Sequence, residues 1–364
     1  MRLAWSAHSS SCLYLGTFEH YYHMKVEDFN DLYELMPLKE DARAGKYCCP
    51  SESSTFDPNN AGNASKMGAI EGKVKLAICL RILFGEAPKS LAQLFHVSLS
   101  SVTDAFHVFL IKIGECDELD FGVKVPTTEE LALRAYEFSR KSSHPTIFRH
   151  CVEAIDGLLI RINCPKYETD QRNFYSGHKL DYGLNLQASC DADCKFVNAS
   201  MCCAGSANDI NAFNASHLPT LYGKYPAPFF VVGNFFNTSK SFINPHSYTG
   251  DNAYPDSDSM LTPSSSGSVD LTHDAYNFFQ SQIRIHIELA FGILNTVFAI
   301  LQKPLKCEVS RCCLVVQACL RLHNFRIDRG CQVCTMMRCC HLRLQYIFST
   351  EGQTVTKFGV CVHR

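Results

Sequence analysis

A largely apolar run from Cys151 to Ile162 constrains the fold of this chain more than any other segment. Its length and its content of Val, Ile and Leu predict a buried β-strand. Asp156 lies midway along the run, where a carboxylate is costly to bury unless it binds a metal ion or a base. The run therefore predicts a sheet that presents Asp156 at a polar site.

The residues that follow continue the pattern of a sheet. Three further strands are expected, at residues 182–189, 195–201 and 229–232. Helices are expected at residues 206–218, 274–301 and 315–325. A meander of three strands, a helix, a fourth strand and two more helices is typical of an α/β sheet flanked by helices.

Upstream of this sheet, the chain has the pattern of packed helices. They are expected at residues 73–84, 91–95, 101–113 and 129–141. Ser90 and Ser100 are expected to cap the second and the third of them. These two helices and the short turn between them match the helix-turn-helix plan. Three packed helices without DNA contact are the alternative, because the later helix of the pair offers Lys112 as its only Lys or Arg.

The composition limits the class of protein. With 364 residues, of which 46% are hydrophobic and 19% charged, the chain is globular in type and long enough for two domains. A net charge of -2 argues against a strongly basic nucleic-acid-binding protein, so any DNA contact must use local patches. The sequence shows no signal peptide and no apolar run of membrane-spanning length, so the twenty cysteines are expected to be mostly reduced.

The two ends of the chain are its least regular parts. Residues 1–68 are expected to form a variable, irregular N-terminal segment, apart from a short helix at 26–36. Residues 331–364 are expected to form an irregular, poorly packed tail. Cys331 and Cys334, with the cysteines and histidine that follow, are an alternative zinc site, but their spacing is loose and no second cysteine pair completes it.

Four acidic residues stand out by their contexts: Asp156, Asp209, Asp251 and Glu288. Carboxylates are ligands that Mg²⁺ and Mn²⁺ prefer, and paired ions about 3.5–4 Å apart cut and join phosphodiesters. Asp251 is expected to close the fourth strand beside the first, and Glu288 to lie on a helix that can cross the sheet. A surface ion pair with Arg284, one helical turn earlier, is the alternative role for Glu288.

Six short blocks carry a resemblance to a known family through their order and spacing. They are Ala154 to Gly157, Lys179 to Ala188, Gly205 to Asp209, Gly250 to Pro255, Asn277 to Leu294 and Leu322 to Phe325. Together these blocks resemble the PIF/Harbinger transposases and their domesticated nuclease relatives. The resemblance covers residues 70 to 330.

The resemblance implies an RNase H-like catalytic domain at residues 146–330, a mixed α/β sheet flanked by helices. It places a small all-α, helix-turn-helix-like region before this domain, at residues 69–145. It also implies a DDE site, in which Asp156, Asp251 and Glu288 form the catalytic, metal-binding triad and Asp209 is an additional ligand of the divalent Mg²⁺ or Mn²⁺.

The implied reaction is metal-dependent hydrolysis of DNA at transposon ends, followed by attack of the freed 3′ hydroxyl on target DNA. Members of the family act in the nucleus, and often need a separate Myb-like DNA-binding partner protein. A catalytically impaired descendant that binds DNA or protein is the alternative, and an unrelated metal phosphohydrolase is a third interpretation.

The first departure from the family pattern lies just before Asp251. The seventeen residues Gly233 to Thr249 interrupt the fourth strand, and their removal restores the run Val-Val-Gly-Asp-Asn-Ala-Tyr. A retained in-frame intron is one hypothesis for this insertion, because the codons at both of its ends can supply splice junctions. With the insertion present, Asn234 occupies the position at the strand end, and a neutral amide is a poor substitute for a charged metal ligand.

The second departure follows the helix that carries Glu288. Family members have a Lys-x-Arg arrangement there, and this chain has Asn295 and Val297 at those positions. The loss of two phosphate contacts would weaken DNA binding uniformly across sequences.

Overall fold

The computed structural model describes residues 2–38 and 69–331, with gaps at 122–123, 147, 167, 169, 234–259 and 262–270. For residues 260–261 and 271–277 it describes the backbone alone. The insertion after Gly233 and the tail after Cys331 therefore lie outside the described residues, and so does the zinc alternative beyond Cys331.

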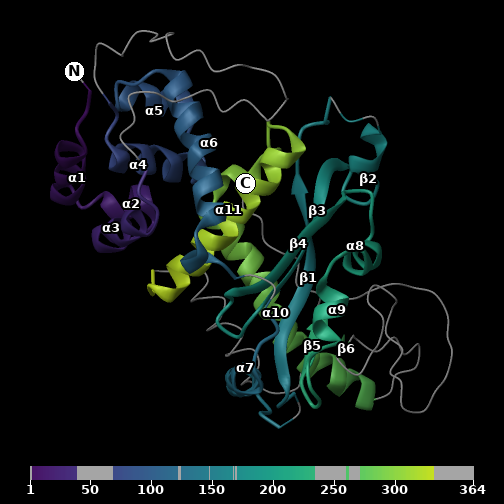
Figure 1. The fold of residues 1–364 in the computed structure, drawn as a ribbon. Helices are drawn as coiled ribbons and strands as arrows, with labels where there is room; N and C mark the ends of the chain where they lie inside the picture. Colours follow the sequence, from purple (N-terminus) through teal and green to yellow (C-terminus); the bar gives the residue numbers. More distant parts are fainter. Residues whose placement is uncertain are drawn as a thin grey trace. The chain divides into compact units, whose positions relative to one another are not determined.

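Six strands among the described residues form the mixed sheet drawn in Figure 1. They are β1 (Cys151–Arg161), β2 (Tyr175–Ser176), β3 (Asp181–Cys190), β4 (Phe196–Ala204), β5 (Phe230–Gly233) and β6 (Met260–Leu261). β3 pairs antiparallel with both β1 and β4, whereas β5 pairs parallel with β1, and β6 parallel with β5. The main sheet thus runs β4-β3-β1-β5-β6, and the short β2 pairs with one end of β3. This sheet, flanked by helices and preceded by a helical region, confirms the expected RNase H-like α/β fold.

Eleven α-helices lie among the described residues. They are α1 (Trp5–Tyr14), α2 (Phe18–Tyr22), α3 (Val26–Leu35), α4 (Gly72–Leu83), α5 (Pro88–Leu94), α6 (Leu99–Glu115), α7 (Thr128–Lys141), α8 (Asp209–Ala215), α9 (Leu218–Tyr222), α10 (Leu271–Val297) and α11 (Val309–Asp328). Short 3-10 helices lie at η1 (Asp117–Leu119), η2 (Gln171–Phe174) and η3 (Ala299–Gln302).

Each face of the sheet is covered by its own set of helices. On one face, Ile155 belongs to an apolar cluster with Leu131 of α7, Phe213 of α8 and Leu221 of α9. On the other face, Phe196 of β4 contacts Phe291 of α10 and His323 of α11, with ring centroids 5.8 and 4.7 Å apart. The alternation of side chains along the strands of the sheet thus supplies apolar surface to helices on both sides.

α5 and α6 form the expected helix-turn-helix. Four residues separate the two helices, which are bent by 112° relative to each other. His96 makes the turn with a left-handed backbone, at φ 52°. The caps differ from the expectation: α5 begins at Pro88, which presets the helical φ, and Ser98 rather than Ser100 caps α6 by accepting a hydrogen bond from the Ser101 amide.

α1 and α2 correct the expectation of an irregular N-terminal segment. Trp5 stacks on Phe29 of α3 at a centroid distance of 4.5 Å, and Tyr22 is fully buried. His8 and the Tyr22 hydroxyl share a hydrogen bond of 2.7 Å. These aromatic contacts bury enough apolar surface to hold three short helices that have little intrinsic stability.

The expected helices at 206–218 and 274–301 are also corrected. The first is divided into α8 and α9, and Ser216 marks the break by accepting a hydrogen bond from the amide of Leu218. The second ends at Val297 and continues as η3.

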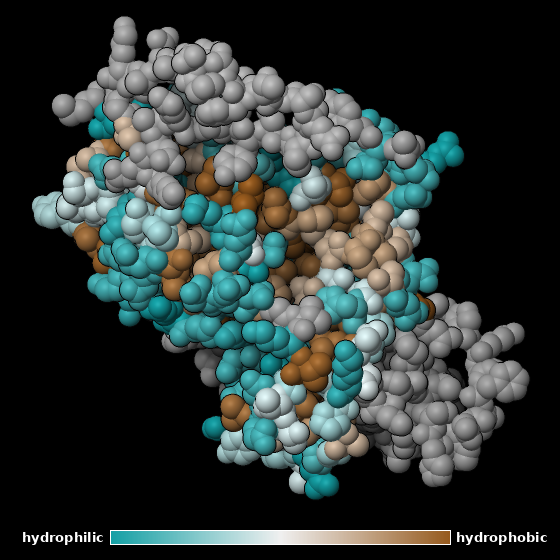
Figure 2. Space-filling model, viewed as in Figure 1, coloured by the Kyte–Doolittle hydropathy of each residue, from teal (hydrophilic) through white to brown (hydrophobic). Residues whose placement is uncertain are grey.

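No single described helix is long and apolar enough to span a membrane, although α5 and α6 together reach that length and composition as a bent pair. Figure 2 shows apolar side chains gathered over the middle of the drawn face, between α6 and β3, with polar ones around them.

Candidate functional site

Asp156 lies in the middle of the sheet, on the central strand. In β1 it faces Ala188 of the antiparallel neighbour β3, and its Oδ1 accepts a hydrogen bond of 2.8 Å from the amide of Gly157. On the other side, the parallel pairing of β1 with β5 ends where Ile155 faces Gly233. Asp156 is therefore the first residue of β1 beyond the end of β5.

α10 crosses the strands on the Asp156 face of the sheet. Ala154 of β1, Cys190 of β3 and Phe196 of β4 are cross-strand partners and so share one face. Because Phe196 contacts Phe291 of α10, that face is the one α10 covers. Asp156 lies two residues from Ala154 and points to the same side.

The path of α10 can be followed from its two contacts with the sheet. Buried Gln280 donates a 3.0 Å hydrogen bond to the carbonyl of Gly233 at the end of β5, and Phe291 reaches β4. Eleven helical residues span about 16 Å, close to the roughly 14 Å of three strand spacings. The segment around Glu288 therefore passes over β1 and β3. The expectation that this helix crosses the sheet is confirmed.

Glu288 lies at the exposed edge of the buried face of this crossing helix. Ile283, Ile287 and Ala290 are buried beneath it at helical spacing, whereas the Glu288 side chain is 46% exposed. It forms an ion pair with Arg284 at 2.9 Å, the alternative foreseen for it. A pair this exposed contributes only about 0–1 kcal/mol, so it restrains Glu288 weakly.

Asp209 lies on the other face of the sheet. It begins α8, and its Oδ1 accepts hydrogen bonds from the side-chain amide groups of Asn185 (3.1 Å) and Gln187 (3.0 Å). A Cβ added to Gly157 would lie 2.2 Å from this oxygen, so Asp209 covers the side to which Gly157 points. Successive residues of a strand face opposite sides, so the structure does not bring the Asp209 and Asp156 side chains together.

Asp251, the remaining acid of the expected site, lies outside the described residues. Within the described part of the chain, no group of three or more His, Cys, Asp or Glu side chains could hold a metal ion. The chemistry of Asp156 and Glu288 suits a hard divalent ion. These two acids supply only part of the ligand set that such an ion requires.

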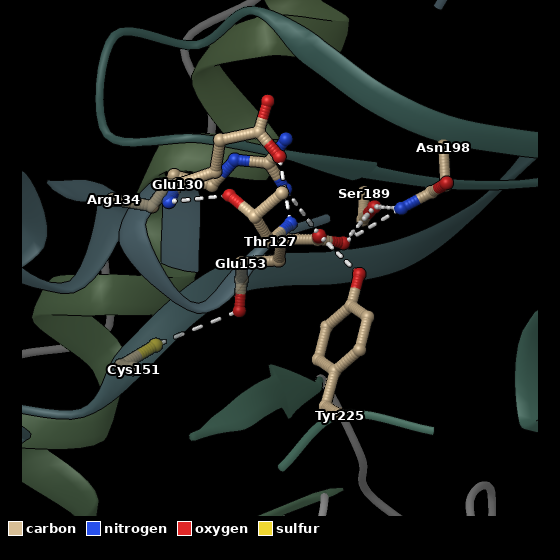
Figure 3. Close-up of polar contacts among 8 residues, drawn as sticks. All are labelled: Thr127, Glu130, Arg134, Cys151, Glu153, Ser189, Asn198 and Tyr225. Atoms are coloured by element: carbon tan, nitrogen blue, oxygen red, sulfur yellow. Dashed lines mark hydrogen bonds and ion pairs between the residues drawn. The ribbon is translucent and has the colours of Figure 1, made fainter. Parts of the chain in front are cut away.

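A buried carboxylate that the sequence analysis did not single out lies three residues before Asp156. Glu153 is fully buried, and Figure 3 shows the groups that meet it. Arg134 of α7 and the Tyr225 hydroxyl donate to Oε1 at 2.9 and 2.7 Å. Ser189 of β3 and Asn198 of β4 donate to Oε2 at 2.6 and 3.0 Å. Glu153 thus joins three strands, one helix and the loop that holds Tyr225.

The helix that supplies Arg134 is itself fixed at its start. Thr127 and Glu130 form a capping box at the beginning of α7, drawn in Figure 3, with reciprocal hydrogen bonds of 3.2 and 2.7 Å. Burial and the adjacent Glu153 carboxylate raise the pKa of Tyr225, so the hydroxyl keeps its proton and remains a donor. The signal for Glu153 was present in the sequence, because it interrupts the same apolar run as Asp156.

Comparison with known proteins finds a similarity for this part of the chain. Residues 155–324 match the family model described as DDE superfamily endonuclease. No curated protein and no solved structure matches the chain. The matched stretch begins one residue before Asp156 and ends in α11, so it includes Asp156, Asp209 and Glu288. The sheet and its crossing helix are therefore the part of the molecule that is similar to the DDE superfamily endonucleases.

Proposed function

We propose that residues 146–330 form the core of a Harbinger-type, metal-dependent DNA endonuclease or transposase, with Asp156, Asp251 and Glu288 as its acidic triad. The family match of residues 155–324 supports the nuclease class. The strand order and the crossing of α10 on the Asp156 face support the assignment of the triad.

The pairing of Ile155 with Gly233 is the observation that carries this proposal. In a parallel pair, the residue after Gly233 would come level with Asp156. If Gly233 to Thr249 were absent, Gly250 would follow Val232 and Asp251 would take the position next to Asp156. Two carboxylates from neighbouring strand ends, below a helix that carries a third, are the donors a divalent ion requires.

The three acids would hold Mg²⁺ or Mn²⁺ in the shortened chain. Bound ions would activate the attacking oxygen and stabilise the leaving 3′ oxygen. Asp209 is left out of this ligand set, because its Oδ1 accepts two amide hydrogen bonds on the other face of the sheet. Gln280 would hold the strand end and the crossing helix in place through its bond to the Gly233 carbonyl.

The proposed partners are transposon-end DNA and target DNA, in the nucleus. The net charge of -2 and the single Lys112 on α6 leave few groups for phosphate contacts. A separate Myb-like protein that supplies sequence recognition therefore fits this chain better than strong DNA binding on its own.

A catalytically impaired descendant that binds DNA or protein is the second candidate. Two observations favour it: the insertion before Asp251 and the ion pair that engages Glu288 with Arg284. The two candidates differ in a measurable way, because only the first needs the acids for a chemical step.

Metal-dependent nicking of supercoiled plasmid DNA by the full chain and by a chain lacking residues 233–249 tests the proposal. The shortened chain should nick DNA with Mn²⁺ or Mg²⁺ and stop when the metal is chelated. Asp156→Asn and Glu288→Gln should each lower the rate at least about a hundredfold, since a bound ion contributes several kcal/mol to such a step. Glu129→Gln, an exposed acid on α7, serves as the matched control.

Nicking that survives Glu288→Gln would exclude the proposed site. If neither chain nicks DNA while both bind it, the second candidate is correct. If only the shortened chain nicks, the insertion is what disables the protein.

A further inference from the structure

Two cysteine sulfurs approach each other just ahead of α11. The Sγ atoms of Cys307 and Cys312 lie 3.4 Å apart, and the Cys312 thiol also lies 3.5 Å from the Cys307 carbonyl oxygen. A disulfide requires about 2.05 Å, so closure needs a shift of little more than an ångström. Side-chain rotation at the exposed end of a helix can supply a movement of this size.

The setting of Cys307 favours its thiolate. The residue precedes Glu308, the N-cap of the twenty-residue helix α11, and Arg311 lies in the first turn. A helix N-terminus and a nearby guanidinium both stabilise a thiolate. The hydrogen bond from Cys312 lowers the pKa of Cys307, and together with the charge of Arg311 it outweighs the opposing effects of burial and of Glu308.

The two thiols differ in a way that separates their roles. Cys307 is partly exposed, whereas Cys312 is fully buried. The pKa of Cys312 is raised, first by its hydrogen bond to Cys307 and then by burial. Cys307 can therefore meet a reagent from solvent, and the buried Cys312 thiol lies within reach of Cys307.

The other close cysteine pair of the described residues lacks these features. Cys202 and Cys203 are 3.8 Å apart but are consecutive residues of the extended strand β4. Successive side chains of a strand point to opposite faces, which opposes a bond between them. No group of three or more His, Cys, Asp or Glu side chains that could hold a metal ion lies among the described residues.

We infer that Cys307 and Cys312 form a redox-active dithiol that is oxidised by small disulfides such as glutathione disulfide. The Cys307 thiolate attacks one sulfur of the glutathione disulfide, forms a mixed disulfide and releases one glutathione thiolate. The Cys312 thiol then loses its proton and attacks Cys307 Sγ, which releases the second glutathione. Two electrons pass to glutathione disulfide, and one intramolecular disulfide is formed.

This disulfide would join two parts of the fold. Leu305 lies two residues before Cys307 and pairs with Ile162 at the end of β1. Its carbonyl oxygen accepts a 2.9 Å hydrogen bond from the backbone amide of Asn163, and its own amide donates a 3.0 Å bond to the carbonyl oxygen of Arg161. Cys312 lies in the first turn of α11. Oxidation would therefore tie the segment beside β1 to α11. The inference rests on thiol geometry and does not depend on the proposed nuclease activity.

Equilibration of the full chain with glutathione and glutathione disulfide, followed by alkylation, trypsin digestion and mass spectrometry, tests this inference. Trypsin cuts after Lys306, Arg311 and Arg321, so the two thiols fall in separate peptides, 307–311 and 312–321. In the wild-type protein these peptides should become linked, with a mass two hydrogens below their sum. Cys312→Ala should instead accumulate one glutathione on Cys307 and prolong that adduct by more than about tenfold, because the resolving thiol is gone.

The matched control is Cys313→Ser, which alters the next residue and should leave the linkage unchanged. Cys307→Ser should leave Cys312 reduced, because its thiol is buried. The inference is wrong if peptides 307–311 and 312–321 stay unlinked while Cys307 remains open to alkylation, or if Cys313→Ser abolishes the linkage. The wild-type measurement decides the question even if a variant folds poorly.

Discussion

Glu153 buries its side-chain carboxyl group completely, and its four hydrogen-bond donors explain why this burial is tolerated. Each oxygen accepts two hydrogen bonds, and Arg134 supplies the opposite charge. Glu153→Ala would leave a guanidinium and three donors without their acceptor. A buried pair broken in this way costs about 3–5 kcal/mol. Urea unfolding followed by far-UV circular dichroism should show a loss of stability of this size.

Two further variants, Glu153→Gln and Glu129→Ala, test whether the loss of stability comes from the missing acceptor at Glu153. Glutamine keeps the shape of Glu153, but presents an NH₂ group to groups that are themselves donors, so it should also destabilise the fold. Glu129 is exposed on the same helix as Arg134, and its removal should change stability by less than about 0.5 kcal/mol. If Glu153→Ala unfolds at the wild-type midpoint, the carboxylate is not the structural centre inferred from its contacts.

The acids of the candidate site show where prediction from the sequence ends. A charge within an apolar strand marks Asp156 as unusual, and the same reasoning applies to Glu153, which lies on the opposite face. Helical spacing places Glu288 at the exposed edge of a crossing helix. The sequence between Gly205 and Asp209 does not reveal which face of the sheet α8 covers, because that depends on the path of the loop from β4. Sequence reasoning therefore identified the unusual residues better than it grouped them.

At the scale of single elements, the start of α6 distinguishes two serines that look alike in sequence. The Oγ of Ser98 accepts a hydrogen bond of 3.0 Å from the Ser101 amide, whereas Ser100 lies inside the helix. Ser98→Ala should lower the free energy of unfolding by about 1 kcal/mol. Ser100→Ala should change it by less than about 0.5 kcal/mol, since alanine is the better helix former. Chemical denaturation of the two variants makes the comparison, and a larger loss in Ser100→Ala would reverse the assignment of the cap.

The observed strands and helices agreed with those predicted from the sequence wherever the pattern of apolar residues was clear. β1, β3 and β4 were found close to their expected bounds, because apolar residues that face two helix layers leave a clear strand signal. α1 was missed because it buries Trp5, His8 and Cys12, a helical spacing in which one position is polar. His8 becomes a core residue only through its hydrogen bond to Tyr22, a contact that local sequence does not contain.

At the scale of the whole molecule, Arg321 joins the helical region to the sheet. From α11, its buried guanidinium donates to the carbonyl oxygens of Ile113 and Cys116 at 2.8 and 2.6 Å, and to Asp120 at 2.9 Å. These acceptors lie at the end of α6 and just beyond it. Since α11 also packs on β4 through His323, one side chain couples two regions that the sequence analysis treated as separate domains.

Trp5 makes this coupling measurable, because it is the only tryptophan of the chain and lies buried in the helical region. In the wild-type protein, Trp5 fluorescence and far-UV circular dichroism should report one coincident urea transition. Arg321→Met fills a similar volume but leaves buried carbonyl groups unpaired, so the fluorescence transition should move to lower urea, ahead of the circular dichroism. Arg140→Met, at an exposed arginine on α7, should leave the two transitions together. If they also stay together in Arg321→Met, other contacts are sufficient to make the helical region and the sheet unfold as one unit.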